Sequence, residues 1–173
     1  MKFSKVQCFF IVVFLLSRVS FAYSFNTKWI GMPKNINDRE LNSIRADLKN
    51  PNTVYLGTNK HLYRSVDGGL SWKEIFSCRG EQKGINDIFI GENETLYIAT
   101  KSGVFKSTDG KNEWKNIFKG SFSGEKDIKS LAMDVKSNTV YVLTSSALYK
   151  TKDGGSVWEK IFFSSDFTDE YNL

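Results

Sequence analysis

Short runs of hydrophobic and β-branched residues recur along the chain at regular spacing. The runs VYLGT, LYIAT and VYVLT contain Tyr55, Tyr97 and Tyr141, which are 42 and 44 residues apart. Each run is followed closely by a second one: HLYRS, GVFKS or ALYKT. The runs are short and bounded by Gly, Ser or Asn, which is typical of strands rather than helices. The pattern therefore predicts a repeated unit made of β-strands.

Two further runs complete each repeat. An apolar run precedes the tyrosine run in every unit, at Ser43–Leu48, Ile85–Ile90 and Ile128–Val135. A last strand is marked by an isoleucine three positions after a tryptophan, at Ile75, Ile117 and Ile161. Four short strands in a repeat of roughly 40 to 45 residues are typical of a propeller blade. We therefore expect an all-β protein, a β-propeller of four-stranded antiparallel blades.

The repeat sets the expected boundaries of the units. We place blade 1 at residues 42–79, blade 2 at 80–122 and blade 3 at 123–166, with residues 167–173 as a tail or the start of a further strand. Trp29 lies 43 residues before Trp72, and Met32 follows Trp29 by three. We interpret Phe25–Met32 as the outer, latching strand of another blade, within a latch and linker segment at 23–41.

About three blades and a latch strand make only a partial propeller, because closed rings have typically 4 to 8 blades. Three explanations stay open: a truncated sequence, a second chain that completes the ring, or a short open stack. We favour truncation, because an open stack would expose apolar faces and strand edges.

The first 22 residues have the pattern of a secretory signal peptide. Lys2 and Lys5 precede an apolar run at Cys8–Leu16, and Ser20-Phe21-Ala22 supplies small residues around a cleavage site. We expect cleavage after Ala22 and a secreted or periplasmic protein. The alternative is an uncleaved membrane anchor, but spanning a bilayer needs about 20 apolar residues and this run has nine. We therefore expect no stable membrane insertion after cleavage.

Removal of this segment changes the charge and cysteine content. Lys2, Lys5 and Arg18 are lost, which leaves 21 basic residues against 19 acidic and lowers the net charge from +5 to +2. A nearly neutral chain without a clustered basic face does not favour a nucleic-acid partner. Cys78 becomes the single cysteine, so no disulfide within the chain is expected, and we interpret it as a half-buried apolar side chain.

A turn motif, Ser/Thr-x-Asp-Gly-x-x-x-Trp, occurs once in each repeat. The carboxylate of such a turn can accept backbone N–H groups, its glycines can adopt positive φ, and its tryptophan can bury a large ring. We therefore interpret the motif residues as structural. They are Ser65, Asp67, Gly68, Gly69 and Trp72 in unit 1, Ser107, Asp109, Gly110 and Trp114 in unit 2, and Thr151, Asp153, Gly154, Gly155 and Trp158 in unit 3.

The alternative is that these aspartates are glycosidase carboxylates. Such pairs lie about 5 to 10 Å apart, whereas one aspartate per blade would be spread around the rim, so we expect no catalytic role. Unit 2 departs from the motif, with Lys111 where units 1 and 3 have glycine and Glu113 where unit 1 has Ser71. Its DGKNE stretch lacks the alternating ligands of a calcium loop.

His61 is the single histidine and stands at the expected start of a strand. We expect it to be exposed. No CxxC or HxxxH spacing accompanies it, so the sequence predicts neither a metal site nor a cofactor.

The turn motif resembles the Asp box of BNR-repeat proteins. With this motif, the N-terminal signal and the phrases VYLGT, LYIAT and GVFKSTDG, the chain resembles the photosystem II assembly factor family. The resemblance covers about Trp29 to Phe162. Sortilin-type receptors, sialidases and xyloglucanases share the box on larger propellers. The resemblance implies a non-enzymatic platform for an unidentified protein partner, for which Lys60, Lys83 and Lys101 are loop candidates.

The enzyme alternative is a fragment of a sialidase-like hydrolase. Sialidases carry an Arg-Ile-Pro phrase and an arginine cluster for the substrate carboxylate. This chain lacks that phrase, and after signal removal its arginines are Arg39, Arg45, Arg64 and Arg79. We therefore expect a non-enzymatic scaffold.

Overall fold

The computed structural model describes residues 35–79, 84–121 and 123–163. The expected signal peptide at 1–22, the latch strand with Trp29, Lys83, and the tail at 167–173 lie outside the described residues. Within the described part, no helix combines the length and apolar character needed to cross a membrane.

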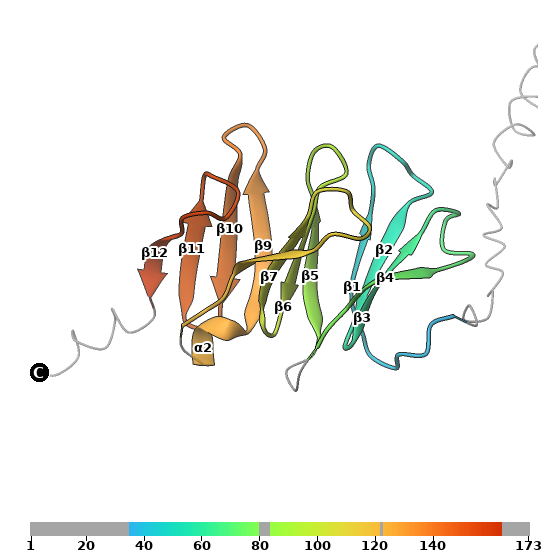
Figure 1. Ribbon diagram of the computed structural model, residues 1–173, viewed down its shortest axis with the longest axis horizontal. Helices are drawn as coiled ribbons and strands as arrows, with labels where there is room; N and C mark the ends of the chain where they lie inside the picture. Colours follow the sequence, from blue (N-terminus) through green and yellow to red (C-terminus); the bar gives the residue numbers. More distant parts are fainter. Residues whose placement is uncertain (1–34, 80–83, 122, 164–173) are drawn as a thin grey trace, which may run out of the picture. The chain divides into compact units, whose positions relative to one another are not determined.

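Three four-stranded antiparallel sheets make up this part of the chain, and each is one blade (Figure 1). Strands pair in chain order within every blade. Blade 1 contains β1 (Leu41–Ala46), β2 (Val54–Thr58), β3 (His61–Ser65) and β4 (Lys73–Ser77). Blade 2 contains β5 (Ile85–Ile90), β6 (Leu96–Thr100), β7 (Gly103–Ser107) and β8 (Lys115–Phe118). Blade 3 contains β9 (Ile128–Asp134), β10 (Thr139–Thr144), β11 (Ala147–Thr151) and β12 (Glu159–Phe163). The predicted all-β fold, a partial propeller of four-stranded blades, is confirmed.

The first strand begins and ends two residues earlier than the apolar run at Ser43–Leu48 indicated. β1 ends at Ala46 because the next residue, Asp47, closes a turn. The Asp47 amide donates to the carbonyl of Thr53 (2.9 Å), and the Asp47 carboxylate accepts the amide of Lys49 (2.8 Å). Leu48 falls in this turn and is almost fully exposed, so its hydrophobic character did not mark a strand.

The cores lie between blades. Leu62 of blade 1 packs with Ile85 and Ile98 of blade 2, and Val104 of blade 2 packs with Ile128 and Val142 of blade 3. All six side chains are fully buried. Burial on both faces explains why the middle strands read as continuous apolar runs rather than as alternating ones.

The outer face of blade 1 lacks such a neighbour among the described residues. Strand register shows which positions of the two blades correspond. Leu41 pairs with Thr58 as Ile85 pairs with Thr100. Ile44 pairs with Leu56 as Ile88 pairs with Ile98. Leu41 and Ile44 are 49% and 59% exposed, whereas Ile85 and Ile88 are 0% and 1% exposed. The same side-chain positions are therefore a core in one blade and an open face in the other.

The interface between blades 1 and 2 requires a glycine at position 57. A Cβ added to Gly57 would lie 2.6 Å from Ser43 Oγ and 2.8 Å from Ile85 Cγ2. Since overpacking of this kind costs about 1 to 3 kcal/mol, we expect Gly57→Ala to lower the free energy of unfolding by that amount in urea titrations. Gly68→Ala, with no atom within 4 Å of its Cβ but with φ of 71°, separates steric crowding from backbone strain. A G57A variant as stable as the wild type would contradict the close packing.

Candidate functional site

The three Asp-box carboxylates are held inside their own turns. Asp67 Oδ1 accepts the Ser65 hydroxyl (2.7 Å) and the Ser71 amide (2.9 Å), and its Oδ2 accepts the Ser71 hydroxyl (2.5 Å). Asp109 accepts the Ser107 hydroxyl (2.7 Å) and the amide of Lys111 (2.9 Å).

Asp153 is held in the same way. It accepts the Thr151 hydroxyl (2.7 Å) and the amides of Ser156 (2.9 Å) and Val157 (3.0 Å). The glycines after the three aspartates, Gly68, Gly110 and Gly154, have φ of 71°, 61° and 70°. These values lie in the left-handed region that favours glycine. The structure thus places each aspartate in a separate turn rather than beside another aspartate.

The tryptophans of the boxes connect neighbouring blades. Trp114 Nε1 donates to the carbonyl of Ile75 in blade 1 (3.0 Å), and Trp158 Nε1 donates to the carbonyl of Ile117 in blade 2 (2.8 Å). Trp72 instead donates within its own turn, to the carbonyl of Gly69 (2.9 Å). The box therefore fixes both a turn and the contact with the preceding blade.

The hydrogen bonds of the boxes predict a loss of stability in acid. Bonds from Ser71 lower the pKa of Asp67 to about 2, and bonds led by the amides of Lys111 and Val157 lower the pKa of Asp109 and Asp153. A carboxyl whose pKa is lower in the folded chain stabilises the fold above its ordinary pKa of about 4 and loses this effect as the pH falls. We expect the thermal midpoint to fall as the pH is lowered from 4 toward 2.

This acid dependence can be assigned by mutation. Asp67→Asn removes one titrating group and should flatten the decline between pH 4 and pH 2, measured by circular dichroism against temperature. An unchanged slope in D67N would show that other carboxyls cause the acid transition.

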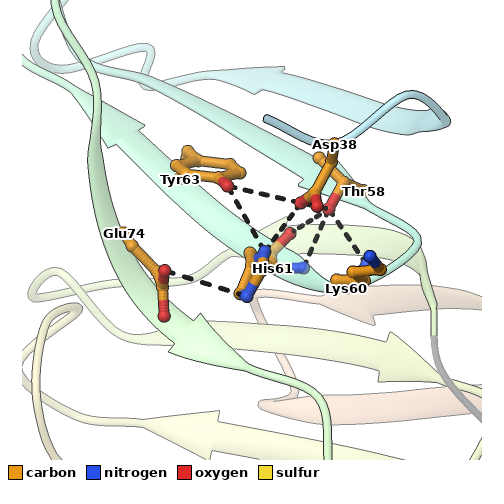
Figure 2. Close-up of polar contacts among 6 residues, drawn as sticks. All are labelled: Asp38, Thr58, Lys60, His61, Tyr63 and Glu74. Carbon is orange, nitrogen blue, oxygen red and sulfur yellow. Dashed lines mark hydrogen bonds and ion pairs between the residues drawn. The ribbon is translucent and has the colours of Figure 1, made fainter. Parts of the chain in front are cut away.

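A second polar cluster lies at the ends of β2 and β3 away from the Asp box, and it brings together several titratable side chains of blade 1 (Figure 2). Asp38, which precedes β1, has a side chain that is only 3% exposed. Its Oδ2 accepts the Thr58 hydroxyl (2.6 Å), lies 2.7 Å from His61 Nδ1, and accepts the more distant Tyr63 hydroxyl (3.3 Å). His61 Nε2 faces Glu74 Oε2 of β4 at 3.8 Å.

The local sequence explains why these groups meet. Thr58 and His61 flank the two-residue turn between β2 and β3, and Thr58 Oγ1 accepts the amides of Lys60 (3.1 Å) and His61 (2.8 Å). This turn directs the imidazole toward Asp38. Tyr63 follows His61 by two residues, so both side chains leave the same face of β3.

Burial and hydrogen bonding set the ionisation of the cluster. Burial alone would raise the pKa of Asp38, but the bonds from Thr58 and His61 outweigh it and hold that pKa below its ordinary value. Burial, together with the nearby Asp38 charge, raises the pKa of Tyr63 to about 12. At neutral pH the cluster therefore contains a buried carboxylate and a neutral phenol.

Blade 3 contains a counterpart of this cluster. Glu125 lies in the short helix α2 (Ser123–Lys126), and its Oε1 accepts the Tyr149 hydroxyl (2.6 Å) and the Lys160 ammonium (2.7 Å). Its Oε2 accepts the amide of Ser121 (3.2 Å). In both blades a buried carboxylate before the first strand binds a tyrosine of the third strand and one basic side chain. The recurrence indicates that the arrangement belongs to blade architecture.

The prediction that His61 is exposed is wrong. It does begin β3, but its side chain is only 25% exposed because Asp38 and Tyr63 cover it. No local sequence pattern indicates this contact, since Asp38 lies 23 residues earlier. Cys78 is buried at 9% exposure, more deeply than the predicted half-buried side chain, in the core between blades 1 and 2.

Among residues 35–79, 84–121 and 123–163, no group of three His, Cys, Asp or Glu side chains has the geometry of a metal site. The Asp38 and His61 pair could orient an imidazole toward a reacting group, as in catalytic dyads. However, its outer nitrogen faces the carboxylate of Glu74. The geometry thus favours a structural contact.

The family model described as "Photosynthesis system II assembly factor YCF48" matches residues 24–166. A search of curated proteins gave no match. Among solved structures, YCF48 from Cyanidioschyzon merolae is 23% identical with a TM-score of 0.56, and covers 70% of this chain and 36% of its own. The structure described as YCF48 bound to D1 peptide is 20% identical with a TM-score of 0.57, over 70% of this chain and 39% of its own.

Enzymes share the same fold. An ancestral GH74 enzyme is 23% identical with a TM-score of 0.61, over 73% of this chain and 19% of its own. The chain therefore spans well under half the length of these structural relatives. At these identities the structural similarity shows the fold and not the activity.

Proposed function

This chain belongs to the family of the photosynthesis system II assembly factor YCF48, and we propose that it is an exported, non-enzymatic scaffold that binds another protein. The observation that carries the proposal is the family match over residues 24–166. It is supported by the relative whose structure is described as bound to D1 peptide. The N-terminal signal pattern supports export.

The carboxylates that accept hydrogen bonds within the described blades also favour binding over hydrolysis. A general acid must hold its proton near the working pH. The pKa values of Asp38, Glu125 and the box aspartates are lowered instead, by hydrogen bonds within the blade. These groups are therefore occupied in holding turns and strands.

Glycoside hydrolysis is the second candidate, favoured by the similarity to the ancestral GH74 enzyme. Two assays separate the candidates. Fluorogenic sialoside and β-glucan substrates should show no turnover by the purified full chain above the rate of a buffer blank. Turnover that disappears when a single carboxylate is replaced would overturn the non-enzymatic assignment.

The scaffold proposal itself is tested by capture in the native host. The full chain with a C-terminal tag is cross-linked in intact cells, and its partners are identified by mass spectrometry. We expect one or a few proteins that are absent from cells expressing an equally tagged, unrelated exported protein. Recovery of the same proteins in both samples would count against a specific scaffold.

A further inference from the structure

Two cavities occupy equivalent places between adjacent Asp-box turns. One lies between the boxes of blades 1 and 2, has a volume of about 330 Å³, and is lined by Arg64, Trp72, Lys73 and Lys111 among others. We call it the Arg64 cavity. The other lies between the boxes of blades 2 and 3, with a volume of 510 Å³, and is lined by Lys106, Trp114 and Lys115 at the corresponding positions.

The two cavities differ in charge. Among the described residues, the lining of the Arg64 cavity has three basic side chains and no carboxylate, whereas that of the second cavity includes the carboxylates of Glu113 and Asp153. Two departures from the repeat cause much of this difference. Ser71 stands where blade 2 has Glu113, and Lys111 stands where blade 3 has Gly155.

The acids around the Arg64 cavity are already engaged. Asp67 and Asp109 accept bonds from their own turns. Glu94 contacts the Lys111 ammonium at 3.7 Å, and this exposed pair is weak. An added anion would therefore not have to displace a buried ion pair.

Arg64 is the basic group best placed to bind an anion. Its Nε is buried without a hydrogen-bond partner among the described residues, and its guanidinium lies 6.0 Å from the centre of the Tyr55 ring. A guanidinium binds carboxylates with parallel N–H groups. The half-buried indole of Trp72 adds an apolar wall beside this charge.

We propose that the Arg64 cavity binds a carboxylate side chain of an acidic peptide segment. This inference rests on the proposed function, because it takes the ligand to be part of a protein. The volume suits one or two side chains, at the lower end of the roughly 300 to 1,000 Å³ of ligand sites. The charges supply attraction and the indole supplies contact with a neighbouring apolar side chain.

The test uses the full chain and a fluorescent peptide with three glutamates flanked by leucines, measured by anisotropy at low salt. We expect saturable binding, loss of binding when glutamine replaces glutamate, and weakening as salt screens the charges. S71E and K111E should each weaken binding at least tenfold. Blade 2 has Glu113 at the position of Ser71, so the repeat tolerates this residue.

The matched control is K136E, which changes the charge by as much as K111E at an exposed lysine outside the cavity lining. It should change the affinity less than twofold, and thermal unfolding should confirm that all three variants are folded. Equal binding by S71E, K111E and the wild type would overturn the proposal. So would binding of inorganic phosphate or glucuronate, with the same dependence on these variants, in the absence of peptide binding.

The cavity and the scaffold can fail separately. If S71E captures the same cross-linked partners as the wild type, the cavity is not the binding site although the scaffold function stands. If the wild type captures no specific partner, the scaffold function fails, and the peptide titration still reports whether the cavity binds carboxylates.

Discussion

Replacing Asp87 with alanine is expected to lower the free energy of unfolding by about 3 kcal/mol, because the Ser130 hydroxyl and the Leu131 amide lose their acceptor at about 1 to 3 kcal/mol each. Asp87 lies in β5 and its side chain is 10% exposed. Its Oδ1 accepts Arg45 Nη2 of blade 1 (2.7 Å), and its Oδ2 accepts the Ser130 hydroxyl (2.8 Å) and the Leu131 amide (3.1 Å) of blade 3. One carboxylate thus connects three blades along their first strands.

Urea unfolding followed by circular dichroism measures this loss. Arg45→Met is the comparison: it removes the half-exposed cation but leaves the Asp87 carboxylate its bonds from Ser130 and Leu131, so we expect a smaller loss of about 1 kcal/mol. A D87A variant within 1 kcal/mol of the wild type would contradict the role of Asp87 as a connection between blades. A broadened, two-step transition in D87A would show instead that the blades unfold separately once this connection is lost.

The strands were accessible from the sequence because blade packing imposes a repeated pattern. Buried positions such as Leu62 and Val104 must be apolar in every unit, and tight turns require glycine after the box aspartate. These constraints are local and recur at the same spacing. They predicted the exact bounds of the second and third strands in blades 1 and 2.

The polar contacts between elements could not be predicted in the same way. Asp38 and Tyr63 are 25 residues apart, and Glu125 and Tyr149 are 24 apart. These nearly equal spacings are a signal that a search of the repeat for acids could have found. It is interrupted in blade 2, where Phe105 has no hydroxyl. The contacts of Asp87 have no repeated spacing of this kind. Its side-chain partners in the other blades are Arg45 and Ser130, and neither blade repeats the Asp87 carboxylate with the same partners.

The spacing of 44 rather than 42 residues before the third box also has a structural cause. Phe118 lies ten residues before Ile128, whereas Phe76 lies nine before Ile85. One of the two extra residues is therefore in the connection that forms α2 and positions Glu125. A small irregularity in the repeat marks the place where the chain supplies the buried acid of blade 3.

Replacing Asp38 with alanine is the second large expected effect, a loss of about 3 kcal/mol in the free energy of unfolding. The change removes the acceptor for Thr58, His61 and Tyr63, and buried donors left without an acceptor cost about 1 to 3 kcal/mol each. Thr58 can still donate to the carbonyl of His61 (3.0 Å), so the three losses do not simply add. Urea unfolding at pH 7 measures the difference.

Glu74→Gln is the matched control, because it removes a carboxylate that also faces His61 but is 50% exposed. We expect it to change the stability by less than 1 kcal/mol. The comparison also distinguishes a structural cluster from a catalytic one. If Asp38 served mainly to activate His61 for chemistry, D38A would abolish a hydrolytic rate while leaving the fold nearly as stable. A folded, fully stable D38A protein would therefore contradict the structural role. A destabilised D38A protein with unchanged peptide binding at the distant Arg64 cavity would support it.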